Sequence, residues 1–161
     1  MHLEINKITD ADAALLNTIT TWMYAWWGMQ EGYSFEAVKC YMEHSLQKIR
    51  LPQTYGVFLD GEIIGLYQFT NEDLFARPDL YPWLANVYIH ERYRGKGYGK
   101  MLMESIPVNA PKSLGFDEVY LYTEHVGLYE KFGWQFVSEI DTFLEGARMQ
   151  RLYKLRIPRT L

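Results

Sequence analysis

The fold of this chain is decided by one stretch, which reads Val87-Tyr88-Ile89-His90-Glu91-Arg92-Tyr93-Arg94-Gly95-Lys96-Gly97-Tyr98-Gly99-Lys100-Met101-Leu102. It begins as an apolar strand, turns through three glycines at every second position, and continues as a helix from about Tyr98. Glycines let a backbone approach a ligand closely and expose its N–H groups. Because these N–H groups meet the positive end of a helix dipole, the turn predicts a phosphate or pyrophosphate site. Arg94, Lys96 and Lys100 add positive charge to it.

The turn does not match two common nucleotide-binding motifs. A Walker P-loop needs Ser or Thr after its Gly-Lys pair, whereas Met101 follows Gly99-Lys100. A dinucleotide fingerprint of the form Gly-x-Gly-x-x-Gly needs glycine at position 100 or 102, where the sequence has Lys and Leu. The remaining alternative to a ligand site is a glycine-rich helix-entry loop with incidental basic residues.

Outward from this stretch, apolar alternation predicts strands at residues 3–8, 55–59, 63–69, 83–89, 117–123, 134–140 and 149–157. Asp60-Gly61 accepts the positive φ angles of a tight turn and therefore predicts a hairpin. The last two strands are expected to form an antiparallel pair.

Four helices fill the gaps between these strands. The first starts at the capping box Thr9-x-x-Asp12 and ends at Gly28. The second runs from Ser34 to just before Pro52, with Val38, Met42, Leu46 and Ile49 on its buried side. The third starts near Tyr98 and is cut short by Pro107. The fourth spans residues 126–132 and is closed by Gly133.

The order β-α-α-β-β-β-α-β-α-β-β predicts an α+β fold with a single mixed, mostly antiparallel central sheet flanked by helices. Its 161 residues suit a single domain spanning 1–161. A net charge of -4 argues against a nucleic acid partner. No apolar run is long enough for a membrane span, and no signal peptide is visible. Cys40 is the one cysteine, so we expect a reduced, cytoplasmic protein with no disulfide and no metal site.

The run Arg94-Gly95-Lys96-Gly97-Tyr98-Gly99 resembles the acetyl-CoA pyrophosphate loop of the GNAT superfamily of N-acetyltransferases. The strand before it, residues 82–89, looks like the family's fourth strand, and Gly127–Trp134 looks like its Leu-Tyr-Glu-Lys-x-Gly-Phe segment. The resemblance implies acetyl-CoA as cosubstrate and a primary amine of a small molecule or peptide as acceptor. The implied cofactor-binding residues are Val87, Ile89, Arg94, Gly95, Lys96, Gly97, Tyr98, Gly99 and Lys100, with Val87 and Ile89 contacting the pantetheine arm through their main chain.

The same resemblance places Tyr129 near the CoA sulfur as general acid. A phenol with an ordinary pKa around 10 can protonate a thiolate of similar basicity. The alternative is a half-buried packing tyrosine. Some family members carry a catalytic Glu where this chain has Trp83, and Tyr122 stands where the family often has Asn. The general base is therefore open between His125, Glu124 and a water chain.

Three further features bear on function. Trp22 has the helical spacing of a core residue, whereas Trp27 falls off the apolar face and suits a cleft or an interface, for which a homodimer is one arrangement. The loop acids Glu72, Asp73 and Asp79 would attract an ammonium group or simply be solvated. A non-catalytic acyl-CoA-binding sensor or interaction module of the same fold is the alternative to an enzyme.

Overall fold

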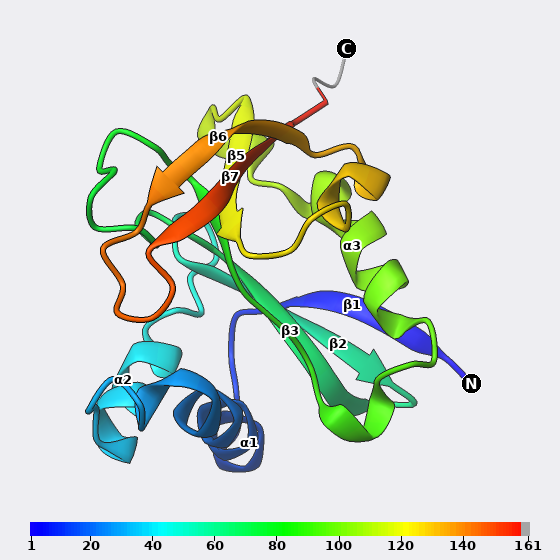
Figure 1. Cartoon of the computed structure of the whole chain (residues 1–161). Coiled ribbons are helices and arrows are strands. Elements are labelled where there is room, and N and C mark those ends of the chain that lie inside the picture. Colours follow the sequence, from blue (N-terminus) through cyan, green and yellow to red (C-terminus); the bar gives the residue numbers. More distant parts are fainter. Residues whose placement is uncertain (159–161) are drawn as a thin grey trace. The chain divides into compact units, whose positions relative to one another are not determined.

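A computed structural model describes residues 1–158 (Figure 1). The strands are β1 Leu3–Ile8, β2 Gln53–Leu59, β3 Glu62–Thr70, β4 Trp83–Ile89, β5 Glu118–Thr123, β6 Gln135–Asp141 and β7 Met149–Arg156. They are hydrogen-bonded in the order β1-β2-β3-β4-β5-β7-β6. The β1–β2, β5–β7 and β6–β7 ladders are antiparallel, and the β4–β5 ladder is parallel. This mixed sheet with its helices confirms the predicted fold class.

The helices are α1 Ala13–Met23, α2 Phe35–Glu43 and α3 Tyr98–Asn109. A π-helix at Tyr24–Gly28 continues α1, and 3-10 turns lie at Glu91–Tyr93, Lys112–Leu114 and Tyr129–Phe132. None of the helices within residues 1–158 combines the length and the apolarity needed to cross a membrane. The chain forms two compact units, one of residues 1–68 and 86–98 and the other of residues 69–85 and 99–158.

In the first unit, α1 and α2 pack on β3 through a core that consists of Leu16, Ile19, Met23, Val38, Met42 and Leu66. The π-helix that follows α1 approaches α2 closely at Gly28, because a Cβ atom added there would lie 2.6 Å from Val38 Cγ2. The predicted hairpin between β2 and β3 is confirmed, with Asp60 at φ 49° and Gly61 at φ 83°.

Two helix boundaries predicted for this unit were wrong. Asp12, not Thr9, is the N-cap of α1, and its side chain accepts a hydrogen bond from the Leu15 amide at 2.8 Å. Helix α2 starts after Ser34 as predicted but ends at Glu43 instead of reaching Pro52. Leu46 is only half-buried, and Ile49 is exposed, because both lie in the irregular segment after this end.

In the second unit, a core of Leu74, Trp83, Ile140 and Leu152 lies between the loop after β3 and the strands β4, β6 and β7. Strand β6 pairs with β7 with an irregularity between Phe136 and Ser138. Helix α3 continues past Pro107 to Asn109, so the prediction that this proline ends the helix was wrong. Pro107 lies in the last turn, where the missing N–H removes only one of the final helical bonds.

Candidate functional site

The glycine turn has the open backbone that an anion site needs. Gly95 and Gly97 adopt φ angles of 75° and 90°, a region that side chains disfavour. A Cβ atom added at Gly95, Gly97 or Gly99 would meet nothing within 4 Å. Gly99 has no positive φ, so its backbone conformation does not require a glycine. The turn ends where α3 begins, at Tyr98.

Arg94 is tied to the end of strand β4. Its Nε donates a hydrogen bond to the Ile89 carbonyl at 2.7 Å, and its guanidinium lies 5.5 Å from the Tyr88 ring centroid. The His90 amide, next along the chain, donates to the Ile64 carbonyl of β3 at 2.8 Å. The structure therefore brings together Ile89 and Arg94 from the predicted cofactor set and orients the arginine with a strand end and a ring.

The other basic side chains of the turn are exposed. Lys96 Nζ lies 5.8 Å from the Tyr93 ring centroid, and Lys100 faces Glu104 one helical turn later at 3.7 Å. A surface ion pair of this kind contributes little to stability, so Lys100 is available to an anion. Tyr98 differs, because its ring is buried and its hydroxyl approaches Met1 Sδ at 3.9 Å. Tyr98 can therefore offer a ligand its main chain only.

Tryptophan side chains of α1 and the π-helix pack against Tyr88 of β4 and against His90, which follows the strand. Trp22 lies 5.3 Å from Tyr88 and 5.6 Å from His90 between ring centroids, and Trp26 lies 5.6 Å from Tyr88. Burial raises the pKa of the Tyr88 phenol. Trp22 is half-buried against the core, as its spacing predicts, whereas Trp26 is 44% exposed. Trp27 is half-buried, and its ring meets that of Tyr41 edge-on at 5.6 Å.

Tyr129 lies in the second unit, at the start of the 3-10 turn Tyr129–Phe132. Its ring contacts Trp134 and Tyr153 at centroid distances of 6.1 and 5.9 Å, and burial raises the pKa of its phenol. Gly133 closes the turn at φ 87°. The raised pKa favours the protonated phenol, which is also the ordinary state of a tyrosine at neutral pH.

The turn is anchored next to Tyr129. The Tyr153 hydroxyl donates to Glu130 Oε1 at 2.6 Å, and Arg151 Nε donates to the Tyr153 oxygen at 2.8 Å. Sequence reasoning missed Arg151 and Tyr153, since nothing in the alternating pattern of β7 distinguishes them from other strand residues.

The two candidate general bases lie at the surface. Glu124 and His125 are exposed, and the His125 amide donates to Thr123 Oγ1 at 3.1 Å. Trp83 is fully buried, so this chain offers a core side chain where some family members were expected to have a Glu. The Tyr122 hydroxyl donates to the Asp73 carbonyl at 3.2 Å and ties the acidic loop to β5.

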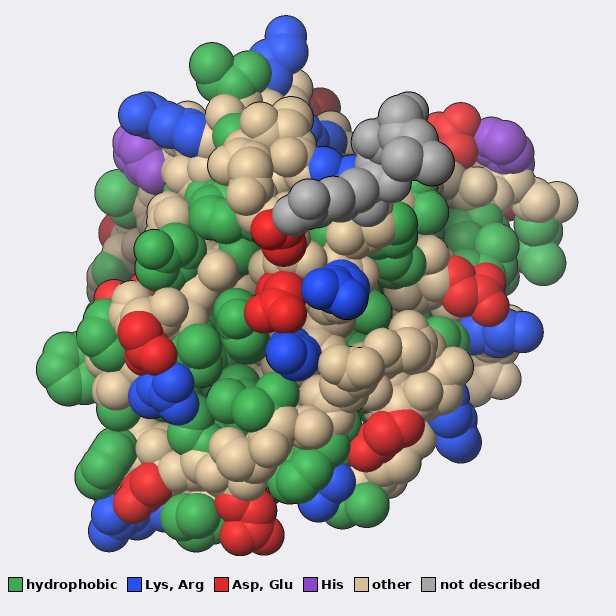
Figure 2. All heavy atoms as spheres, turned by 90° about the horizontal axis from the view of Figure 1, so that it is seen from above, with side chains coloured by type: hydrophobic (Ala, Val, Ile, Leu, Met, Phe, Trp, Pro, Cys, Tyr) green, Lys and Arg blue, Asp and Glu red, His purple; other side chains and the backbone are tan. Residues whose placement is uncertain are grey.

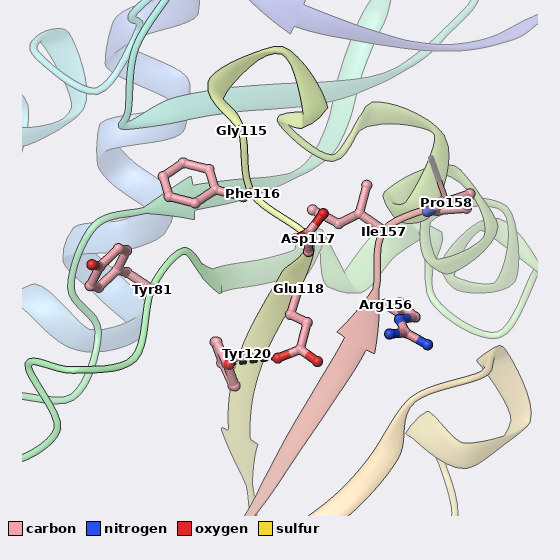
Figure 3. A pocket seen from close by; sticks show the side chains of 9 residues that line it. All are labelled: Tyr81, Gly115, Phe116, Asp117, Glu118, Tyr120, Arg156, Ile157 and Pro158. Atoms are coloured by element: carbon pink, nitrogen blue, oxygen red, sulfur yellow. Dashed lines mark hydrogen bonds between the residues drawn. The ribbon is translucent and has the colours of Figure 1, made fainter. Parts of the chain in front are cut away.

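An open groove of 870 Å³ lies in the second unit (Figure 3). It is lined by the ends of β5 and β7 and by the aromatic pair Tyr81 and Phe116. The Tyr120 hydroxyl donates to Glu118 Oε2 in it at 2.8 Å. The groove contains none of the predicted site residues. Within residues 1–158 no group of three His, Cys, Asp or Glu side chains is placed to hold a metal ion.

The charged side chains on the face shown in Figure 2 are of mixed sign. Acidic and basic groups of the described residues alternate there without forming a continuous basic patch. This distribution matches the small net charge of -4.

Comparison with known proteins gives a consistent result. A family model described as an acetyltransferase (GNAT) domain matches residues 52–136. A spermine/spermidine N(1)-acetyltransferase of Bacillus subtilis (strain 168) is 28% identical over 102 residues, which cover 53% of this chain and 61% of that protein. The chain thus matches less than two thirds of the length of this curated relative.

Two solved structures are similar over almost the whole chain. An aminoglycoside 6'-N-acetyltransferase complexed with coenzyme A gives a TM-score of 0.72 at 14% identity, covering 98% of this chain and 99% of that one. Spermidine N-acetyltransferase from Vibrio cholerae, in complex with CoA and spermine, gives 0.71 at 15% identity, covering 96% and 95%. Likeness at this identity shows a shared fold.

Proposed function

Because the chain belongs to the GNAT acetyltransferase family, we propose that it transfers the acetyl group of acetyl-CoA to a primary amine. The observation that carries the proposal is the glycine turn at the start of α3. Three glycines there leave open space beside the backbone, and two of them adopt positive φ angles. Such a turn at a helix N-terminus suits the pyrophosphate of CoA.

The proposed cofactor contacts follow from this turn. The main-chain N–H groups of residues 95–99 bind the pyrophosphate, with Arg94, Lys96 and Lys100 adding positive charge. Val87 and Ile89 pair with the pantetheine arm through their main chain. The Ile89 carbonyl already accepts the Arg94 bond, but a carbonyl oxygen has a second lone pair for the cofactor.

The proposed chemistry is aminolysis of the thioester. The neutral amine attacks the carbonyl carbon, a C–N bond forms, and the C–S bond breaks. Tyr129 gives its phenolic proton to the departing thiolate, and the amine nitrogen loses a proton to Glu124, His125 or water. Burial raises the pKa of the Tyr129 phenol, which keeps its proton at neutral pH but makes it a weaker acid toward the thiolate.

The acceptor is proposed only as a primary amine of a small molecule or peptide. The names of similar proteins include spermine and spermidine, an aminoglycoside and the N-terminal serine of a ribosomal protein. These acceptors share an amine but little else. Acceptor choice lies in side chains that differ among such proteins, so fold likeness does not select between them.

The test is release of free CoA thiol from acetyl-CoA in the presence of a panel of amines. The panel contains a polyamine, an aminoglycoside, free amino acids and a peptide with a free N-terminus. We expect thiol release with at least one class, together with a product that is heavier by one acetyl group. Acetyl-CoA binding without transfer to any amine would support the non-catalytic sensor instead.

A further inference from the structure

Asn86 is an outlier within strand β4. Its φ angle is 53°, in the left-handed region that residues other than glycine rarely adopt. Among residues 1–158 the other non-glycine residues of this kind are Asp60, in a hairpin turn, and Phe143, in a loop. A left-handed residue inside a strand turns the peptide groups on either side of it out of the regular ladder. Asn86 therefore sets the direction of the main chain that continues into Val87.

A single buried side chain holds Asn86. Gln68 of β3 is fully buried, and its Oε1 accepts a hydrogen bond from Asn86 Nδ2 at 2.6 Å. The same oxygen accepts from the Tyr41 hydroxyl of α2 at 3.1 Å. On its other side, Gln68 Nε2 donates to Thr54 Oγ1 of β2 at 2.9 Å.

The bonds of Thr54 show which way the Gln68 amide points. The Thr54 hydroxyl donates its proton to the Ser45 carbonyl at 2.8 Å, so its oxygen can only accept from Gln68. The nitrogen of Gln68 must therefore face Thr54, and its oxygen must face Asn86. A buried amide with all of these partners is costly to turn, because any other orientation leaves polar groups unpaired.

We propose that Gln68 is a positioning residue for acetyl transfer. It holds Asn86 in the left-handed conformation and so aims the main chain at Val87 and Ile89, on which the thioester arm lies. This inference rests on the proposed function. Its physical basis is that strained backbone persists only where the surroundings enforce it, and such backbone is concentrated at functional sites.

Two pairs of variants separate positioning from mere stability. Gln68→Met keeps the volume of the side chain but loses the bond to Asn86. Thr54→Val is the matched control, because it removes one partner of Gln68 Nε2 on the far side of the amide. Met42 Sδ still lies 3.8 Å from that nitrogen, and the Asn86 and Tyr41 donors still face Oε1, so the Asn86 bond keeps its support. Asn86→Ala loses both the amide and the tolerance for positive φ, whereas Asn86→Gly loses the amide alone.

The measurements are kcat with the best acceptor of the panel, CoA affinity by calorimetry, melting temperature, and hydrogen exchange of the amides of residues 86–89. We expect Gln68→Met and Asn86→Ala to lower kcat at least about tenfold, since small misplacements of bound reactants cost rate steeply. CoA affinity should change less than about threefold, because the glycine turn is untouched. Asn86→Gly should fall between Asn86→Ala and the wild type.

Thr54→Val should lower the melting temperature but keep kcat within about twofold of the wild type, since it leaves the Asn86 bond intact. The inference is overturned if Thr54→Val loses as much kcat as Gln68→Met at a comparable loss of melting temperature, or if Gln68→Met turns over like the wild type. Should the wild type bind acetyl-CoA and acetylate nothing, the proposed function fails. Hydrogen exchange then decides the positioning inference by itself. The inference requires that the amides of residues 86–89 exchange faster than in the wild type in Gln68→Met, and that they do not in Thr54→Val.

Discussion

Tyr129 is the residue from which the proposed chemistry takes its proton. Replacing it with Phe keeps the ring contacts with Trp134 and Tyr153 and removes only the hydroxyl. Because general acid catalysis typically contributes 10²- to 10⁴-fold, we expect kcat to fall at least about tenfold while CoA affinity stays within a few-fold. Steady-state kinetics and calorimetry test this, and an unchanged kcat would make Tyr129 a packing residue.

Gly99 gives the cleanest single-residue test of the cofactor turn. Gly97→Val would also block a ligand, but the φ of 90° makes any side chain there strained, so that variant would lose stability as well. Gly99 has no positive φ and no neighbour within 4 Å of an added Cβ, so Gly99→Val should weaken CoA binding while the chain stays folded. The control is Met101→Val, which places the same β-branched residue on the same helix. Equal CoA affinity of the two variants, measured by calorimetry, would remove this turn from the site.

Among the secondary-structure elements, the π-helix and α2 meet at Gly28, which sets the distance between them. The methyl group of Gly28→Ala would lie 2.6 Å from Val38 Cγ2 and 3.3 Å from Tyr24 Cδ2, so one side chain must move. Overpacking of this kind costs about 1–3 kcal/mol in the free energy of unfolding. The double variant with Val38→Ala should recover part of that loss, and additive losses in a double-mutant cycle by urea unfolding would contradict the close approach.

Strand β5 carries a hydrogen bond that should make stability depend on pH. Burial and the bond to Glu118 raise the pKa of Tyr120 to about 12, and that bond holds the pKa of Glu118 below its ordinary value. The folded state therefore keeps the phenol proton that the unfolded chain loses near pH 10, so stability falls from about pH 10 through about pH 12. On the acid side the contribution of Glu118 is present above its unfolded pKa and is lost as pH falls through the lowered folded pKa.

Tyr120→Phe removes the titrating phenol and the largest cause of the lowered Glu118 pKa, whereas the contributions of Lys154 and Arg156 to that pKa remain. Urea unfolding of this variant should show a shallower loss of stability above pH 10 and below pH 4 than the wild type, with equal slopes at neutral pH. Parallel curves for the two proteins across the whole range would show that the bond contributes nothing to either pKa.

For the whole molecule, the expected consequence of cofactor binding is a shift in thermal stability. A ligand bound only to the folded state stabilises by RT ln(1 + [L]/Kd), about 2.7 kcal/mol at a hundredfold excess over Kd. For a chain of this length that corresponds to a rise of roughly 5–10 °C in Tm. Acetyl-CoA and free CoA should both give it, because both carry the pyrophosphate. The absence of a shift with either at millimolar concentration would contradict the site.

The order of the strands, the first three helices, the Asp60-Gly61 hairpin and the bounds of β4 could be predicted from the sequence. The fourth helix predicted at 126–132 was wrong, because only a 3-10 turn over Tyr129–Phe132 forms there. The sequence by itself also determined the family, through the Arg94–Gly99 run and the Gly127–Trp134 segment. These features could be predicted because each depends on neighbours in the chain: alternation on a pleated strand, glycine where φ is positive, and a helix that starts at a turn. Three helix ends were predicted wrongly. In the structure α1 is capped by Asp12, α2 ends at Glu43 and α3 ends at Asn109. Several local signals could end each helix, and packing decides between them.

Only the tertiary structure decided which polar side chains support the site. Gln68 lies 18 residues from Asn86 in the chain and Tyr153 lies 23 residues from Glu130, yet each pair is joined by a hydrogen bond of 2.6 Å. Nothing in their local sequence marks them, because a polar residue in a strand reads as solvent-facing until the neighbouring strand is known. The structure also placed Arg94 on the Ile89 carbonyl and Trp26 beside Tyr88. Arg94 and Ile89 are only five residues apart, but the other contacts join segments that are far apart in the chain. The pairing of strands and the packing of helices on them determine those contacts, whereas periodicity reports only on residues a few positions apart.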